Sequence, residues 1–248
     1  MATSFYDTGE ALAQYLLFHY GTPEQLCPLL PEARGACGFP VRCVTEPLRH
    51  LRLAKTRRAL DLGCAVGRSS FELARHFDDV IGIDFSARFI DAARAMQRDG
   101  AMTIHAPREG IATDEFHLEL PDDISRHRAR FEQGDACNLR TDLGTFDFVL
   151  MANLIDRLPD PARCLAQLPA LIAPRGWLVL TSPYTWLEEY TPRERWLDRG
   201  DGTLAALRAH LAPAFSLHHN FDLPMLIRDH RRKYQWTVTE ASVWQREL

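Results

Sequence analysis

The chain has 248 residues, of which 46% are hydrophobic and 25% are charged. This is the composition of an ordinary globular protein, and the length allows one large domain with a sizeable core. The formal net charge is -4 at pH 7, whereas proteins that grip nucleic acid through its phosphates are usually basic. Nucleic acid is therefore disfavoured as a partner.

The sequence shows no segment that would direct the chain to a membrane or out of the cell. Its N-terminus lacks a basic stretch followed by an apolar one, and no apolar run approaches the roughly 20 residues that cross a bilayer. The six cysteines include no CxxC pair and no cluster with zinc spacing, so we expect no metal site. Scattered cysteines are typical of reducing compartments, and we expect a cytoplasmic protein.

The first predicted element is an amphipathic helix over residues 5–20. A loop rich in Pro, Gly and Cys follows, and residues 39–52 have a second helical pattern. We expect residues 1–52 to form an N-terminal helical cap on a core over residues 53–248. Residues 1–248 would then be a single domain.

Strands and helices alternate from the end of this cap onward. The predicted strands cover residues 58–63, 79–86, 129–139, 146–158 with a loop, and 176–184, and the predicted helices cover residues 68–77, 87–100 and 161–176. The pattern weakens over residues 101–130, where we expect an insertion that contains a hairpin. Alternation at this interval predicts a parallel sheet with helices on both faces.

The last part of the chain changes character. Residues 216–230 and 234–244 are two strand-like runs joined by a short basic loop. They predict an antiparallel hairpin added to the edge of the parallel sheet. The basic residues 228–233 are interpreted as a solvated loop or strand end.

A glycine-rich turn follows the first predicted strand, in the sequence DLGCAVGRSS. A turn of this kind between a strand and a helix usually holds a nucleotide-like cofactor. A P-loop has the pattern G-x-x-x-x-G-K-[ST], but Gly63 and Gly67 are too close together and no lysine follows. The dinucleotide pattern has a small residue where this chain has Arg68. The turn therefore argues against both a triphosphate and a dinucleotide.

Polar residues at the ends of the predicted strands suit S-adenosylmethionine instead. Asp61 offers a carboxylate to the ammonium group of that cofactor, and Gly63 and Gly67 permit close approach of a ligand. Asp84 ends the second strand, where an acid can accept hydrogen bonds from both ribose hydroxyls. Asp135 ends the third strand, near the expected adenine. The alternative, that these acids merely cap strands or helices, stays open.

These strand ends, in this order, resemble the successive motifs of class I S-adenosylmethionine-dependent methyltransferases. The resemblance implies an α/β, Rossmann-like fold with a mostly parallel seven-stranded sheet, helices on both faces and a C-terminal antiparallel hairpin. It also implies S-adenosyl-L-methionine as the cofactor. The residues implied in cofactor binding are Asp61, Gly63, Ala65, Gly67, Asp84, Phe85, Asp135, Ala136 and Asn153.

Two arginines are candidates for binding a carboxylate. Arg42 stands alone in the apolar stretch FPVRCV and suits the carboxylate of either the cofactor or the substrate. A salt bridge to another part of the protein explains it equally well. Arg68 follows the glycine turn and faces either the cofactor carboxylate or solvent.

Longer strings narrow the resemblance. The segments FYDTGEALAQYLLFHYG, FPVRCVTE, LTSPYTWLEEYTPRERWL and RKYQWTVTEASVW look like the methyltransferase of ovothiol biosynthesis, a 4-mercaptohistidine N1-methyltransferase that is also called 5-thiohistidine Nπ-methyltransferase. The resemblance covers nearly the whole chain. It implies methylation of the imidazole ring of 5-thiohistidine to give ovothiol A. This chain has no sequence like the sulfoxide synthase of the larger relatives, so the implied activity is methyl transfer only. Functional pairing with a separate sulfoxide synthase is left open by the sequence.

Other polar and aromatic residues are candidates for catalysis or substrate binding. Their chemistry suits proton transfer, stacking on an imidazole ring or binding an ammonium group. For most of them a place in the core or in a surface contact explains the residue as well. The catalytic candidates are His19, Tyr20 and Asn153, and the substrate-binding candidates are Tyr6, Tyr184, Trp186, Glu188 and Tyr234, with Glu189 as the alternative to Glu188 for an ammonium group.

Two further functions remain compatible with the sequence. One is a methyltransferase for another small amine or acid, because modest stacking and charge serve many such substrates. The other is a catalytically silent module that binds the cofactor without turnover. The acids at Asp61, Asp84 and Asp135 argue against the silent module.

Overall fold

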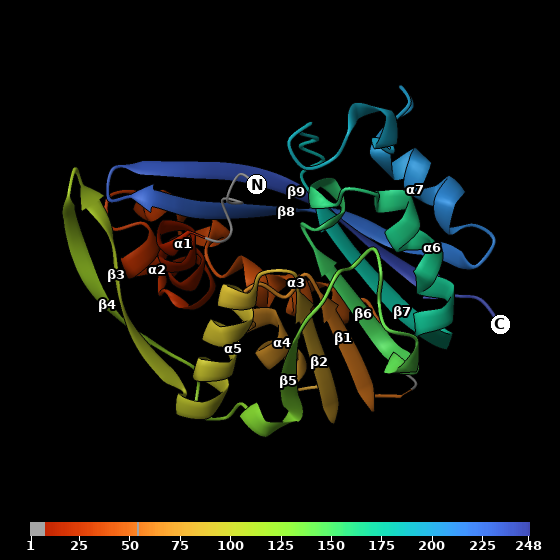
Figure 1. Cartoon of the computed structure of the whole chain (residues 1–248), viewed down its shortest axis with the longest axis horizontal. Helices are drawn as coiled ribbons and strands as arrows, with labels where there is room; N and C mark the ends of the chain where they lie inside the picture. The colour runs from red at the N-terminus through yellow and green to blue at the C-terminus, as the bar shows by residue number, and fades with distance from the viewer. Residues whose placement is uncertain (1–7, 54) are drawn as a thin grey trace.

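In residues 8–53 and 55–248, the part of the chain that this computed structural model describes, seven strands form one sheet in the order β5-β2-β1-β6-β7-β9-β8 (Figure 1). The five strands from β5 to β7 pair in parallel, and β9 runs antiparallel to both of its neighbours. The strands are β1 (Arg58–Leu62), β2 (Asp79–Asp84), β5 (Ala129–Gln133), β6 (Phe146–Ala152), β7 (Ile172–Ser182), β8 (Phe215–His230) and β9 (Lys233–Arg246). The predicted sheet and the hairpin at its edge are confirmed.

Helices cover both faces of this sheet, as predicted. The helices on one face are α3 (Phe39–Leu48), α4 (Arg68–Leu73) and α5 (Ala87–Asp99), and those on the other are α6 (Pro161–Leu171) and α7 (Thr203–Leu211). Successive strand residues point to opposite faces, so that Val80 joins the first core and Ile81 the second. None of the described helices is long and apolar enough to span a membrane.

The parallel register brings the carboxyl ends of four strands to one edge of the sheet. Asp61 on β1 pairs with Gly82 on β2 and with Leu150 on β6. Asp84 at the end of β2 pairs with Gln133 at the end of β5. The loops that follow these strands therefore converge at the edge where ligands bind in open α/β sheets.

The first helix of the chain packs against the loop that follows β1, since the Tyr20 hydroxyl donates to the Val66 carbonyl at 2.6 Å. α1 (Gly9–Tyr20) begins after Thr8, whose Oγ1 accepts a hydrogen bond from the Ala11 amide at 3.1 Å. The short helices α2 (Pro23–Leu26) and η2 (Pro31–Ala36) occupy the predicted loop. The first residues of the helix predicted over 5–20 lie outside the described part of the chain, and the division into a cap and a core stays a proposal.

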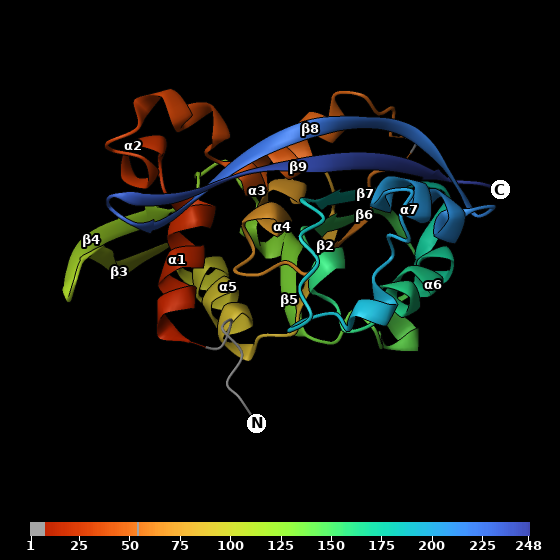
Figure 2. The ribbon, with the colours of Figure 1, turned by 90° about the horizontal axis from the view of Figure 1, so that it is seen from above.

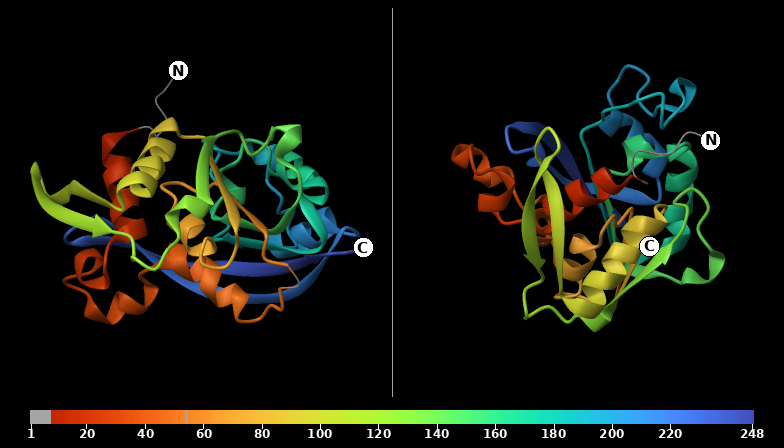
Figure 3. Two further views of the ribbon diagram at one scale, coloured as in Figure 1. Left: turned by 90° about the horizontal axis from the view of Figure 1, so that it is seen from below. Right: turned by 60° about the vertical axis from the view of Figure 1, so that its left-hand side comes forward.

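The segment after α5 forms a second sheet of two strands. β3 (Ala101–Glu109) and β4 (Ala112–Glu119) pair antiparallel along their whole length. This confirms the hairpin expected in the insertion. The pair stands apart from the seven-stranded sheet (Figure 3).

β8 and β9 continue well past the rest of the sheet. β7 pairs with β9 only between Trp177–Gln245 and Ser182–Glu240, so residues 223–239 extend beyond β7. We call these residues the arm. Figure 2 shows the two strands extending past α1 toward β3 and β4.

Arg228 fastens the arm to the β3–β4 hairpin. Its side chain is only 2% exposed, and its Nη2 donates to Asp114 Oδ2 on β4 at 2.9 Å. Its Nη1 donates to the Gln25 carbonyl at 2.8 Å, and its guanidinium lies 5.2 Å above the Phe116 ring. These partners allow the guanidinium to be buried. The prediction that residues 228–233 are a solvated loop or strand end is therefore wrong for Arg228.

Candidate active site

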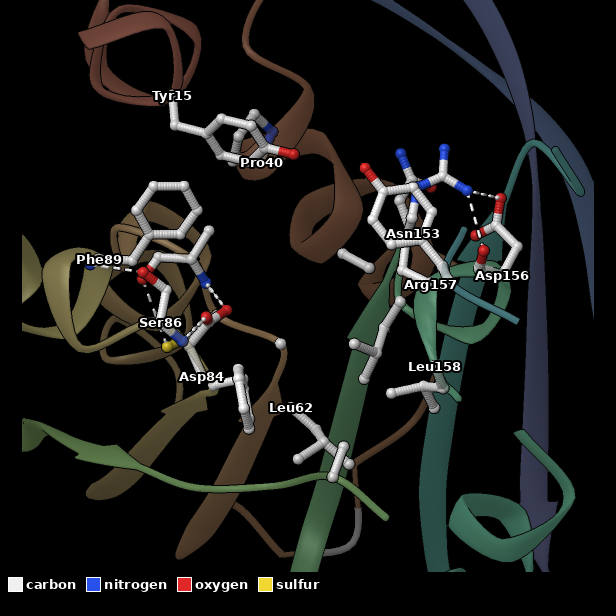
Figure 4. Close-up of a pocket in the computed structure, with 18 of the residues that line it drawn as sticks. Tyr15, Pro40, Leu62, Asp84, Ser86, Phe89, Asn153, Asp156, Arg157 and Leu158 are labelled. Carbon is white, nitrogen blue, oxygen red and sulfur yellow. Dashed lines mark hydrogen bonds and ion pairs between the residues drawn. The ribbon is translucent and has the colours of Figure 1, made fainter. Parts of the chain in front are cut away.

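A cavity of about 680 Å³ opens at the carboxyl edge of the sheet. Figure 4 shows Asp84 and Ser86 on one wall and Asn153 and Arg157 on the wall opposite, with Tyr15 of α1 at the rim between them. The predicted site residues that line this cavity are His19, Gly63, Ala65, Asp84, Phe85, Asp135, Ala136 and Asn153.

The glycine turn after β1 has an unusual backbone. Gly63, Ala65 and Gly67 have φ angles of 80°, 47° and 90°, in the left-handed region that favours glycine. A Cβ on Gly67 would lie 2.7 Å from the Phe131 ring. Gly67 thus lets the turn pack on the core, while Gly63 and Ala65 present backbone to the cavity.

Asp84 fixes the mouth of this turn. Its Oδ2 accepts a hydrogen bond from the Ala65 amide at 2.9 Å, and its Oδ1 accepts one from the Ser86 amide at 2.9 Å. Each carboxylate oxygen has a second lone pair, so Asp84 can hold the turn and accept hydrogen bonds from ribose hydroxyls together.

Asp61 lies beneath the turn and does not line the cavity. Its carboxyl is 1% exposed, and its Oδ2 accepts a hydrogen bond from the Ser70 hydroxyl at 2.6 Å. Among the described residues its Oδ1 has no hydrogen-bond partner. Burial raises the pKa of Asp61 to about 7, with Asp84 adding to the shift. Any effect of Asp61 on a cofactor ammonium therefore acts across the turn.

The ends of β2 and β5 form the side of the cavity where the adenine is expected from the sequence. Phe85 lines it and is 72% exposed, which leaves its ring available for a flat ligand. Asp135 and Ala136 line the same side. Asp135 Oδ1 accepts a hydrogen bond from the Cys137 amide at 2.8 Å, which holds this loop in place.

Asn153 lines the opposite wall in a strained conformation. Its φ is 51°, which is uncommon outside glycine. Its amide and its Oδ1 are both bonded to Thr181, and its Nδ2 donates to the sulfur of Met225 on the arm at 3.1 Å. Strain of this kind persists only where surrounding contacts impose it, and it clusters at functional sites.

α1 supplies an aromatic wall. Tyr15, Phe18 and His19 all line the cavity, and the Tyr15 ring lies 4.8 Å from that of Phe89 between centroids. Burial, with Arg68 nearby, lowers the pKa of His19 to about 3. His19 is therefore a neutral imidazole at pH 7 and a weak base.

Tyr20, a predicted catalytic residue, has a structural contact instead. Its hydroxyl donates to the Val66 carbonyl at 2.6 Å, and it does not line the cavity. Burial raises its pKa well above the usual value. Tyr20 joins α1 to the glycine turn, because a buried hydroxyl requires a partner.

The two arginines predicted to bind a carboxylate are engaged elsewhere. The guanidinium of Arg42 donates to the carbonyls of Ala36, Cys37 and Pro224. Arg68 pairs with Glu72 at 3.0 Å, and both side chains are less than a tenth exposed. Neither arginine lines the cavity.

Four of the substrate-binding candidates do not line the cavity, namely Tyr184, Trp186, Glu188 and Tyr234. The Tyr184 hydroxyl donates to Glu240 Oε2 at 2.8 Å, and Trp186 Nε1 donates to Thr203 Oγ1 at 3.1 Å. Glu188 has a side chain that is 66% exposed and lies 3.9 Å from Arg193. The Tyr234 hydroxyl donates to the Arg231 carbonyl at 2.6 Å. Tyr6 lies outside the described residues.

Sequence reasoning missed Asp156, Arg157 and Tyr190, which line the cavity. Glu189, the alternative to Glu188 that the sequence offered for binding an ammonium group, lines it as well. Arg157 Nη1 donates to Asp156 Oδ2 at 3.0 Å, and the Arg157 guanidinium lies 5.2 Å from the Tyr190 ring centroid. Burial raises the pKa of Asp156 although Arg157 opposes the shift. The one available signal was their position in the loops after β6 and β7, which end at this edge.

The cavity fits S-adenosylmethionine. The turn exposes backbone, Asp84 offers acceptors for a ribose, and Phe85 and Asp135 line the cavity beside it. The strand order of the sheet, with this turn after β1 and an acid after β2, defines a class I S-adenosylmethionine-dependent methyltransferase.

The comparison with protein families agrees. A family model described as a methyltransferase domain matches residues 40–224, and the chain belongs to this family. Among curated proteins it is similar to the ubiquinone biosynthesis O-methyltransferase of Acinetobacter baylyi, with 25% identity over 48% of this chain and 41% of the relative. The enzyme of that name from Coxiella burnetii is 27% identical over 52% of this chain and 44% of its own length. The chain thus spans less than half the length of these relatives.

Solved structures share the fold. The N-methyltransferase NodS from Bradyrhizobium japonicum, in complex with S-adenosyl-L-homocysteine, matches with a TM-score of 0.55 and 16% identity over 97% of this chain and 98% of NodS. A methyltransferase from Methanosarcina mazei matches with a TM-score of 0.54 and 20% identity over 82% of this chain and 97% of its own. The [4+2]-cyclase SpnF matches with a TM-score of 0.55 and 15% identity over 84% of this chain and 81% of SpnF. At these identities the likeness concerns the fold alone.

Proposed function

We propose that this methyltransferase methylates the imidazole ring of 5-thiohistidine, which gives ovothiol A. The observation that carries the proposal is the composition of the cavity beyond the glycine turn. Aromatic rings of Tyr15 and Phe18 face it from α1, and both signs of charge are present at Arg157 and Glu189. A small aromatic zwitterion needs stacking surface and two opposite charges. The resemblance of the long sequence strings supports the same substrate.

The bound cofactor would supply a methyl group activated by an adjacent sulfonium. The task of the protein is then chiefly to position the acceptor and to exclude water. The acceptor nitrogen needs a free lone pair, which one tautomer of the ring already has. A strong base is not required, which agrees with the pKa of about 3 for His19.

His19 and Asn153 are the proposed orienting groups at the reaction centre. Both line the cavity, and Asn153 is fixed by Thr181 and by Met225 of the arm. Polar side chains that are already ordered select one acceptor orientation at little cost in entropy. Tyr20 is no longer among the catalytic candidates.

A mass-spectrometric turnover assay tests the proposal. The protein is incubated with S-adenosylmethionine and 5-thiohistidine, with histidine and ergothioneine as controls. We expect a gain of one methyl group on 5-thiohistidine alone. Methylation of histidine instead, or no product while the cofactor binds, would refute the substrate assignment.

Two alternatives follow from particular observations. The curated relatives are named O-methyltransferases of ubiquinone biosynthesis, which favours a methyltransferase for another small acceptor. The cyclase SpnF shares the fold, and the second alternative is a module that binds the cofactor without methyl transfer. A panel of small amines and acids distinguishes the first alternative, and cofactor binding without turnover on any of them supports the second.

The proposal extends to the setting of the reaction. The six cysteines are free and buried, which supports the cytoplasmic location expected from the sequence. Functional pairing with a separate sulfoxide synthase, as the source of the thiohistidine, belongs to the same proposal.

A further inference from the structure

The charged residues of the cavity are unevenly distributed. Those that line it, within the described part of the chain, are Asp84, Asp135, Asp156, Glu189 and Arg157. His19 is neutral at pH 7 because burial lowers its pKa. Arg157 is thus the single cation among these lining residues. A ligand carboxylate in this cavity meets one group of opposite charge and several of like charge.

Arg157 is held in a fixed orientation. Its Nη1 donates to the Asp156 carbonyl at 2.9 Å, to Asp156 Oδ2 at 3.0 Å and to the Thr185 carbonyl at 2.8 Å. The Tyr190 ring lies against the guanidinium. The Arg157 side chain is 24% exposed, whereas that of Asp156 is 1% exposed. The guanidinium is a planar fork of five donors, so it can engage a fixed counter-ion and a second carboxylate together.

Arg157 and the residues beside the glycine turn lie on opposite walls of the cavity. Asp84 and Ser86 lie on the wall beside the glycine turn, and Arg157 lies on the opposite wall with Asn153 (Figure 4). The cofactor is expected beside the glycine turn and Asp84, so we assign a carboxylate that meets Arg157 on the other wall to the acceptor.

Glu189 supplies the complementary charge. It lies in the loop after β7 that also carries Thr185 and Tyr190, and it lines the cavity, whereas the neighbouring Glu188 does not. An acid and a guanidinium that line the same cavity match in charge the two groups of an amino acid backbone.

We propose that Arg157 binds the α-carboxylate of the methyl acceptor and that Glu189 binds its α-ammonium group, so that the acceptor is recognised as a free amino acid. This rests on the proposed function for methyl transfer, and it adds the recognition of the backbone end of the acceptor. The ring end is then left to the aromatic wall of α1. Peptide-bound or decarboxylated rings would be excluded.

The first test changes the ligand and leaves the protein intact. The wild-type complex with S-adenosylhomocysteine is titrated calorimetrically with 5-thiohistidine, its carboxamide and its decarboxylated amine. We expect both analogues to bind about 10–100-fold more weakly, since each loses a charge-assisted pair. Equal affinity for acid and carboxamide overturns the proposal, as does failure of the complex to bind any free amino acid. If a different amino acid binds and is methylated, the substrate assignment fails. The comparison of acid with carboxamide is then repeated with that amino acid, and it tests the present proposal in the same way.

The second test changes the protein. Arg157→Gln should raise the KM for the acceptor about 10–100-fold and abolish the preference for acid over carboxamide, with the Kd of S-adenosylhomocysteine changed less than about threefold. A rise in that Kd with the acceptor KM unchanged would assign Arg157 to the cofactor and overturn the proposal. Arg157→Lys, which retains the charge but loses the fork, should recover part of the affinity. If the Arg157→Gln variant does not fold, the acceptor KM of the Arg157→Lys variant tests the proposal instead.

Adjacent glutamates provide a matched control. Glu189→Gln should raise the acceptor KM and make the enzyme insensitive to N-acetylation of the acceptor. Glu188→Gln, outside the cavity, should leave both unchanged. Equal effects of the two substitutions would remove Glu189 from the proposal.

Discussion

Asp61 combines deep burial with an incomplete set of hydrogen bonds. The carboxyl has Ser70 as a partner and Asp84 nearby, and burial raises its pKa to about 7 from 3.8. The folded protein therefore holds the proton more tightly than the unfolded chain. Stability from this group is greatest below pH 3.8 and is lost as the pH rises to about 7.

Asp61→Asn should remove this dependence on pH. The free energy of unfolding of the variant, relative to wild type, should increase by about 3 kcal/mol between pH 5 and pH 8. Urea titrations of both proteins without cofactor, at several pH values, measure the difference. Curves that stay parallel across this range would show that the Asp61 carboxyl does not titrate there.

Tyr20→Phe tests the structural assignment of a residue that the sequence placed in catalysis. The substitution removes the hydroxyl that donates to the Val66 carbonyl, and we expect a loss of about 1–2 kcal/mol in unfolding free energy. The kcat should fall less than about tenfold, because Tyr20 does not line the cavity. A loss of kcat of about a thousandfold in a folded variant would restore the catalytic role.

Residues at strand ends were predictable, and side-chain directions elsewhere were not. Asp84 and Asp135 line the cavity because a parallel sheet collects the ends of its strands at one edge. Arg42 and Tyr184 also belong to promising segments, but backbone carbonyls and Glu240 take their polar atoms. Pro224, a partner of Arg42, and Glu240, the partner of Tyr184, are distant in sequence, and a single chain gives no sign of them.

Elements with strong periodicity were predictable for a similar reason. β6 and β7 have continuous apolar runs, and the β3–β4 hairpin was expected in a weak region and is present. α7 was not predicted. α4 ends at Leu73, before the predicted residue 77. The amides of Arg75 and His76 donate to the carbonyls three residues earlier, which is the tighter pattern of a turn. Short-range competition of this kind leaves little trace in apolar spacing.

The contact between the arm and the β3–β4 hairpin depends on Arg228. Arg228→Ala would leave Asp114 without its 2.9 Å partner, and we expect the free energy of unfolding to fall by about 3 kcal/mol. Amide hydrogen exchange in β3 and β4 should also become faster. Arg232→Ala, at the exposed turn of the arm, is the control and should change stability by less than about 0.5 kcal/mol. Equal effects of both substitutions would mean that the ion pair does not hold the hairpin.

The cavity joins the two ends of the chain over the central sheet. α1 contributes Tyr15 and the arm contributes Met225, and Gln14 Nε2 donates to Asp229 Oδ1 at 2.9 Å. The Tyr20 hydroxyl then links α1 to the glycine turn. A ligand in the cavity therefore contacts segments that are distant in sequence and are joined to one another by hydrogen bonds.

Binding of S-adenosylhomocysteine should consequently stabilise these segments as a unit. At a free concentration about 100-fold above Kd, the free energy of unfolding should rise by about 2.7 kcal/mol. Amide hydrogen exchange should slow in α1, in the glycine turn and in the arm at the same ligand concentration, because opening any one of them exposes the ligand. α7, which does not line the cavity, serves as the internal reference for exchange. If exchange slows only in the glycine turn, α1 and the arm are not coupled to cofactor binding. Their role would then be limited to binding the acceptor.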